Sequence, residues 1–191
     1  MAYQTYITDA LVCASCDRNT ADRAYLLFTR EAGMVWANAR SVREERSKQR
    51  FALQDLSYAR STLVHGKTGW RVAGVEPIQN FYYTAPSREV RAFLKKSVRL
   101  LRRVMHGDTP HPTLFDRTIA ACRESDTLDP KDLELIFSLG ALAELGYVDP
   151  TATIVPLLPP AALADAVGEL TDATRTECEK VIASGLAHSQ L

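Results

Sequence analysis

The sequence is poor in the features that mark membrane, secreted and strongly polyionic proteins. Its 23 Lys and Arg residues are balanced by 23 Asp and Glu residues, so the formal net charge is zero. No apolar run approaches the roughly 18 residues that a membrane-spanning helix needs. The first residues lack the basic and then apolar pattern of a secretory signal. We therefore expect a cytoplasmic protein with no membrane contact.

Cysteine is scarce, and its placement argues against a metal or redox site. Cys13 and Cys16 form a C-x-x-C pair, but a structural zinc site needs a second pair at similar spacing, which the sequence does not supply. A thioredoxin-type motif begins a helix, whereas this pair ends a strand-like run. His106 and His111 have no third ligand nearby. We expect no cofactor, and we interpret all four cysteines as small apolar residues: Cys13, Cys16, Cys122 and Cys178.

Catalytic motifs are also missing. The sequence contains no Gly-rich phosphate loop, no G-x-S-x-G elbow and no paired carboxylates at a plausible site. The acidic residues of the last third are spread along helical patterns, where a solvated face explains them better than acid–base chemistry. We therefore expect a protein that is not an enzyme.

Charge is distributed unevenly along the chain. Residues 1–80 carry 11 cations against 8 anions, residues 81–107 carry 7 against 1, and residues 108–191 carry 5 against 14. Such asymmetry suggests a polyanionic partner for the basic part, although an acidic part that only keeps the protein soluble is equally consistent with it.

The first 80 residues favour short β-strands separated by turns. Tyr, Thr, Ile and Val are frequent in these runs, and Gly33 and Gly69 lie at turn positions. Five strands with hairpin connections predict a five-stranded OB-fold barrel, followed by an α-helical domain; the fold class is thus α+β. We place the domains at residues 1–80 and 81–191. The expected strands are residues 3–13, 22–30, 34–40, 51–64 and 70–78.

The period changes to a helical one from about Pro86. Apolar residues between Val90 and Met105 fall on one side of a helix, and its other side is almost purely cationic, with Glu89 as the only anion. Further helices are expected over residues 113–124, 130–146, 161–170 and 172–187, with Asp129 as a cap of the second. The cations of the first helix are Arg88, Arg91, Lys95, Lys96, Arg99, Arg102 and Arg103.

The stretch "RSVREERSKQR", residues 40–50, places five cations and two anions between two expected strands. Long cations on such a loop can reach a nucleic-acid backbone, and Ser47 can donate to phosphate oxygens. The alternative is a solvated turn held by a pair such as Glu45 with Lys48. A second basic cluster in the helix favours binding. The candidate residues in this part are Arg40, Arg43, Arg46, Ser47, Lys48 and Arg50, with Lys67 and Arg71 near the last strand.

Trp36 has two possible roles. By two-residue alternation it shares a strand face with Asn38 and Arg40, so an aromatic stacking surface could adjoin the basic loop. Inward aromatics are common in small barrels, however, and we favour core packing for Trp36 while keeping it among the candidate DNA-binding residues.

An ordered series of short motifs resembles the N-terminal region of the RecO recombination-mediator family. Residues 27–29, "LFT", precede the Gly33 turn; an Arg-rich segment then carries Ser47-Lys48; residues 53–54, "LQ", open the next strand; and Gly66 and Gly69 flank a late hairpin. Residues 135–147, "LIFSLGALAELGY", look like the family helix that precedes a zinc-binding segment. Many members carry four cysteines there and this chain carries none, so the resemblance does not extend to zinc.

The resemblance implies a DNA repair accessory protein with an OB-fold followed by a helical domain. Such a protein binds single- and double-stranded DNA, promotes strand annealing and acts with RecR to load RecA onto strands coated by single-strand binding protein (SSB). The family also binds the acidic C-terminal tail of SSB in its helical domain. The resemblance further implies a cytoplasmic, nucleoid-associated location. Two alternatives remain: a protein-interaction adaptor that does not bind DNA, and an OB-fold protein that binds RNA.

Overall fold

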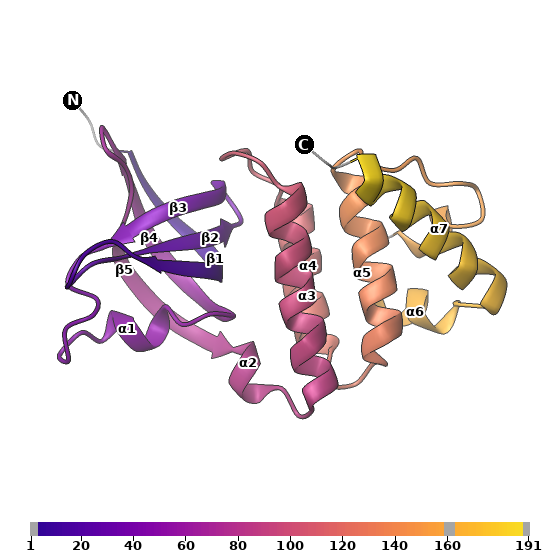
Figure 1. Ribbon diagram of the computed structural model, residues 1–191, viewed down its shortest axis with the longest axis horizontal. Coiled ribbons are helices and arrows are strands. Elements are labelled where there is room, and N and C mark those ends of the chain that lie inside the picture. Colours follow the sequence, from indigo (N-terminus) through magenta and orange to yellow (C-terminus); the bar gives the residue numbers. More distant parts are fainter. Residues whose placement is uncertain (1–3, 159–162, 189–191) are drawn as a thin grey trace. The chain divides into compact units, whose positions relative to one another are not determined.

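The computed structural model in Figure 1 describes residues 4–158 and 163–188. The chain divides into two compact units. The first comprises Met1–Thr84 and His106–Pro112, and the second comprises Ala85–Met105 and Thr113–Leu191. A β-barrel forms the first unit and α-helices form the second. The predicted fold class is therefore confirmed.

Five strands close into a barrel in the order β1-β2-β3-β5-β4. Neighbouring strands are antiparallel except β3 and β5, which pair in parallel through only two residue pairs, Ala37 with Trp70 and Asn38 with Arg71. A closed five-stranded sheet with this crossover is the OB-fold arrangement. The strands are β1 (Gln4–Asp17), β2 (Arg23–Thr29), β3 (Gly33–Ala39), β4 (Ser57–Gly66) and β5 (Gly69–Asn80).

The barrel core follows from the alternation of side chains along each strand. Val35, Ala37 and Ala39 of β3 are buried and join a cluster with aliphatic residues of the other strands, including Leu27 and Leu63. The β2–β3 hairpin turns sharply at Gly33, whose φ of +72° favours glycine. The barrel interior is therefore apolar, and the outward-facing positions of the strands remain available for polar side chains.

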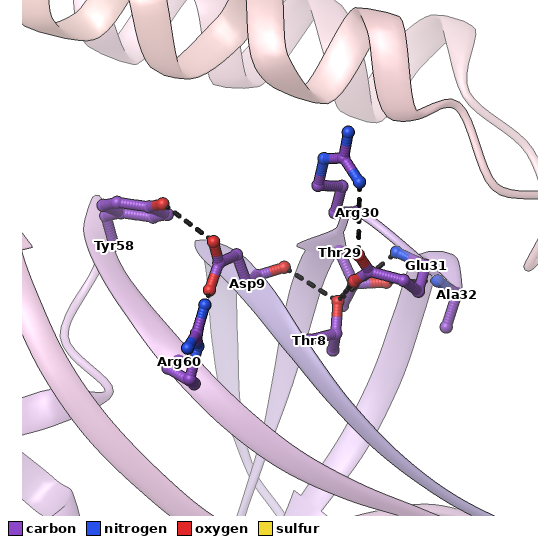
Figure 2. A network of polar contacts seen from close by, with 8 residues as sticks. All are labelled: Thr8, Asp9, Thr29, Arg30, Glu31, Ala32, Tyr58 and Arg60. Carbon is purple, nitrogen blue, oxygen red and sulfur yellow. Dashed lines mark hydrogen bonds and ion pairs between the residues drawn. The ribbon is translucent and has the colours of Figure 1, made fainter.

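A polar network holds the start of β1 and β4 to the β2–β3 hairpin. Figure 2 shows Asp9 between Tyr58 and Arg60: Tyr58 Oη donates to Asp9 Oδ2 at 3.1 Å, and Arg60 Nε donates to Asp9 Oδ1 at 3.1 Å. The Thr8 hydroxyl donates to the Glu31 carboxylate and accepts a hydrogen bond from the Glu31 N–H at 3.3 Å. The network therefore fixes the hairpin from which β3 begins.

The prediction of one strand over residues 51–64 is wrong at its start. A short helix, α1 (Gln49–Ala52), and a turn precede β4, which begins at Ser57. Leu56 has a φ of +63°, which interrupts a strand. Leu53 is buried in the barrel core, so its apolar character reflects closure of the core and not strand pairing.

The second unit is built around α3 (Arg88–Val104), whose apolar face is buried as the sequence predicts. Ser87 caps this helix by accepting a hydrogen bond from the Val90 N–H, and Asp129 caps α5 in the same way. Phe93 of α3 packs edge-on against Phe137 of α5 with ring centroids 6.3 Å apart. The remaining helices are α4 (Pro112–Glu124), α5 (Pro130–Glu144), α6 (Leu163–Gly168), α7 (Asp172–His188) and a 3-10 turn, η1 (Val155–Leu157).

Two short helices belong to different units. The helix expected over residues 161–170 corresponds to α6, and its first two residues lie outside the described residues. Helix α2 (Phe81–Thr84) belongs to the barrel unit, where the Phe81 ring stacks on the Tyr58 ring with centroids 6.2 Å apart. Among the described residues, no helix has both the length and the apolar character needed to cross a membrane.

The cysteines are free thiols with different environments. Cys13, Cys122 and Cys178 are buried, and burial raises the pKa of the Cys178 thiol. Cys16 is exposed, so it takes no part in the packing of the core. In residues 4–158 and 163–188, no group of three or more His, Cys, Asp and Glu residues is arranged to hold a metal ion.

Candidate nucleic-acid interface

The basic loop between β3 and β4, residues 40–50, is fastened to the loop between β1 and β2. The Ser41 N–H donates to Asp22 Oδ1 at 2.8 Å, and the Arg43 N–H donates to the Ala21 carbonyl at 3.0 Å. Val42 is fully buried in the barrel core. The loop is therefore an ordered element with one apolar anchor, and its charged side chains project from a fixed backbone.

The Asp22 carboxylate joins the β1–β2 loop to the basic loop. Its pKa lies below the ordinary value, chiefly because the Asn19 side-chain amide donates a hydrogen bond to it, and further because of the Ser41 N–H and the nearby charge of Arg40. Asn19 Nδ2 lies 3.0 Å from Asp22 Oδ2. The carboxylate thus stays ionised and holds the two loops together.

The cations of the basic loop differ in how strongly their side chains bind to other parts of the protein. Arg43 Nη1 donates to the Asn19 carbonyl at 2.7 Å and lies 3.4 Å from Asp17 Oδ2, so this side chain holds the loop. Arg46 Nε lies 3.1 Å from Glu44 Oε2, but 91% of its side chain is exposed. The alternative of a turn held by internal ion pairs, with Glu45 and Lys48 as the example, therefore has one pair of that kind among the described residues, but it joins Arg46 to Glu44.

The remaining loop residues form an exposed rim. Lys48 and Arg50 are exposed, and the Arg50 guanidinium lies 5.0 Å from the centroid of the Phe51 ring. A shallow depression in the loop is lined by Arg40, Ser41, Glu44, Arg46, Ser47 and Gln49. Guanidinium, hydroxyl and amide donors therefore converge here, and these are the groups that contact phosphate oxygens.

Trp36 is exposed, which makes our preference for core packing wrong. Its exposed fraction is 43%, while Val35 and Ala37 on either side are buried. The face that Trp36 shares with Asn38 and Arg40 therefore points outward, as the alternation requires. The sequence could have predicted this exposure, because the two polar residues on the same strand face as Trp36 mark that face as the outer one.

A small groove lies at the end of β3, beside this face. It is lined by Arg18 and Asp22 from the β1–β2 loop, Asn38 and Arg40 from the end of β3, and residues 68–71 from the β4–β5 hairpin. The parallel pairing of Asn38 with Arg71 brings the two strands together. OB-folds bind oligonucleotides on the face of strands 2 and 3, between the β1–β2 loop and the β4–β5 loop.

The groove includes residues that the sequence did not identify as part of the site. Arg18 lies directly after β1, in a polar turn, and its positive charge was the only feature of the sequence that could have identified it as a site residue. Trp70 joins the groove through the β3–β5 crossover, which no local pattern reveals. Of the two further candidates, Arg71 lines the groove and Lys67 is exposed in the adjoining hairpin turn.

The cations of α3, in the second unit, fall into two sets. Three bind within their own unit: Arg91 Nη2 donates to the Ala85 carbonyl, Lys96 Nζ lies 2.8 Å from Glu134 Oε2, and Arg103 Nη2 donates to the Leu186 carbonyl at 2.7 Å. Four further exposed cations follow one side of the helix over about 21 Å, at 1.5 Å per residue. These are Arg88, Lys95, Arg99 and Arg102.

Comparison with known proteins gives a consistent result. The DNA repair protein RecO of Desulfitobacterium hafniense (strain DSM 10664 / DCB-2) is 31% identical over 142 residues, which cover 74% of this chain and 52% of the relative. RecO of Myxococcus xanthus is 31% identical over 149 residues, covering 76% and 60%. RecO of Dehalococcoides mccartyi (strain CBDB1) is 27% identical over 141 residues, covering 73% and 56%. No family model matches the chain.

The fold and the surface define an OB-type barrel protein with a helical second unit, whose candidate site is a set of exposed cations on an ordered loop and groove. The chain belongs to the RecO family. It spans little more than half the length of the curated relatives that it matches.

Proposed function

We propose that this chain is a recombination mediator. It binds single- and double-stranded DNA, promotes annealing of complementary strands, and acts with RecR to load RecA onto strands coated by SSB. The observation that carries the proposal is the ordered basic loop beside the barrel groove, in a chain whose relatives are named DNA repair proteins. That name is also the reason for preferring DNA to RNA.

Binding by such a surface needs no catalytic residue. Cations that neutralise phosphates release condensed counterions, which makes the affinity fall with salt concentration. Two complementary strands held on a neutralising surface repel one another less, so they pair more readily. The exposed cations of α3 extend this capacity to a second polyanion, and we assign the acidic C-terminal tail of SSB to them.

The test is a titration of a fluorescently labelled single strand with the protein at several salt concentrations, followed by anisotropy. Arg46→Gln with Lys48→Gln removes two exposed loop cations without touching Arg43, which holds the loop. We expect weaker binding and a salt slope lower by about 1.4, since each contact on a single strand contributes about 0.7. The same variant should slow annealing of complementary labelled strands.

The matched control is Lys131→Gln with Lys180→Gln, which changes the net charge equally at two exposed lysines of α5 and α7. This control should leave the salt slope as in the unmodified protein. If both variants change the slope alike, only net charge matters and the loop is not the site. If the unmodified protein fails to bind even at low salt, the protein-interaction adaptor replaces the mediator.

A further inference from the structure

We propose that Trp70 forms a subsite for a single unpaired base, so that the barrel groove distinguishes single strands from duplex DNA. This inference rests on the proposed function, since it names the part of a nucleic acid that the groove accepts. Trp70 is half-buried and contributes to the groove wall. Trp36, the tryptophan that the sequence pattern indicated, is not among the residues that line the groove.

The indole of Trp70 is held rigidly by two other rings. The Tyr6 ring centroid lies 5.0 Å away at an interplanar angle of 59°, and the His65 centroid lies 4.6 Å away at 37°. Trp70 also packs against the barrel core. An aromatic side chain that is already fixed loses little conformational entropy when a base stacks on it.

The charges around Trp70 suit a phosphate on either side of the stacked base. Arg71 lies on β5 and Arg40 directly follows β3, which pairs with β5 through Asn38 and Arg71, and both arginines line the groove with Arg18. Among the described residues that line it, Asp22 is the one anion, and its carboxylate accepts hydrogen bonds from the Asn19 side chain and the Ser41 N–H. The groove therefore combines an aromatic wall with three guanidinium groups, the combination that binds single strands.

Duplex DNA cannot use this subsite, because its bases are stacked on one another and paired. Loop and helix cations contact phosphates of either form, whereas Trp70 contacts only a base that has left the stack. Loss of Trp70 should therefore weaken single-strand binding about fivefold or more, the effect typical of one base–aromatic stack, and should leave duplex binding nearly unchanged.

The protein contains two tryptophans, which makes a direct test possible. Trp36→Phe leaves Trp70 as the sole tryptophan, and Trp70→Phe leaves Trp36. Each variant is titrated with an oligothymidylate of about 16 nucleotides, the upper end of OB-fold site sizes, and with a duplex of equal length. Tryptophan emission reports stacking, and anisotropy of the labelled DNA reports binding independently.

We expect the single strand to quench emission in the Trp36→Phe variant but not in the Trp70→Phe variant, and the duplex to quench neither. Trp70→Leu keeps an apolar side chain against the core and should lose single-strand affinity selectively. Binding by anisotropy without quenching of Trp70 overturns the subsite and leaves the proposed function intact. Absence of binding by the unmodified protein overturns both.

Discussion

Arg117 is a buried cation in the helical unit. It is 3% exposed, and its Nη2 donates to the Leu158 carbonyl, while Nε and Nη1 have no hydrogen-bond partner among the described residues. Burial lowers the pKa of Arg117, and the charge of Glu144 opposes this effect only in part. A buried charge without a full set of partners costs free energy. Arg117 therefore lowers the free energy of unfolding relative to an apolar side chain of the same size.

Arg117→Met should raise the stability of the protein. The substitution removes the desolvated charge and keeps a flexible apolar side chain of similar length, and replacing buried ionic groups by apolar ones often gains about 1 kcal/mol or more. Urea unfolding checks this through a higher midpoint at an unchanged slope. Arg99→Met, at an exposed position of α3, serves as the control and should leave the midpoint nearly unchanged. A lower midpoint for Arg117→Met would show that the Leu158 contact outweighs the buried charge.

Asp22 should make the loop junction sensitive to acid. Its pKa in the folded protein is lowered, so its carboxylate contributes stability that is fully present above its ordinary pKa of about 3.9. That stability is lost as the pH falls through the lower folded value. The urea midpoints of the unmodified protein and Asp22→Asn should thus differ at pH 7 and converge in strong acid. A constant difference at all pH values would contradict the assignment.

The packing of α4 against α5 depends on a missing side chain. Gly140 lies so close to the Arg117 guanidinium that a Cβ atom at this position would collide with it. Gly140 is helical, where glycine is otherwise unfavourable by about 1 kcal/mol relative to alanine. The glycine is therefore explained by the room it leaves for the arginine.

A double-mutant cycle tests this coupling of the two helices. Gly140→Ala alone should destabilise the protein, because the arginine must move out of its place. In the Arg117→Met background the same change should be neutral or stabilising, because the side chain at position 117 is then an uncharged methionine that can move away from the new Cβ atom. Urea midpoints of the four proteins give the interaction energy, and additive effects would show that the contact carries none.

The elements show what local sequence patterns can and cannot predict. α3 was predictable because its apolar and cationic residues separate cleanly at helical spacing, and the Asp129 cap of α5 was equally local. α1 was missed because Leu53 is apolar for a non-local reason, closure of the barrel core. The exposed loop cations were visible in the sequence, whereas the joining of Trp70 and Arg71 to Asn38 depends on a crossover between distant segments.

The molecule as a whole separates its charge along the sequence and not between its two units, because the cationic helix α3 belongs to the same unit as the acidic C-terminal part. The cations of the barrel and of α3 precede a C-terminal part with 14 acidic and 5 basic residues. Arg99→Gln with Arg102→Gln should therefore lower affinity for a peptide ending in acidic residues, measured by calorimetry, and Lys131→Gln with Lys180→Gln should not. Equal losses in the two variants would indicate a dependence on net charge alone.

The short parallel seam between β3 and β5 links the stability of the barrel to its ligand. Two residue pairs join these strands, whereas β4 and β5 pair along most of their length. Local opening begins where few contacts resist it, so backbone amides around Asn38 and Arg71 should exchange with deuterium sooner than those of the β4–β5 ladder. A single strand spanning Arg40 and Arg71 would clamp the seam and slow this exchange, because a ligand that binds only the closed form stabilises it.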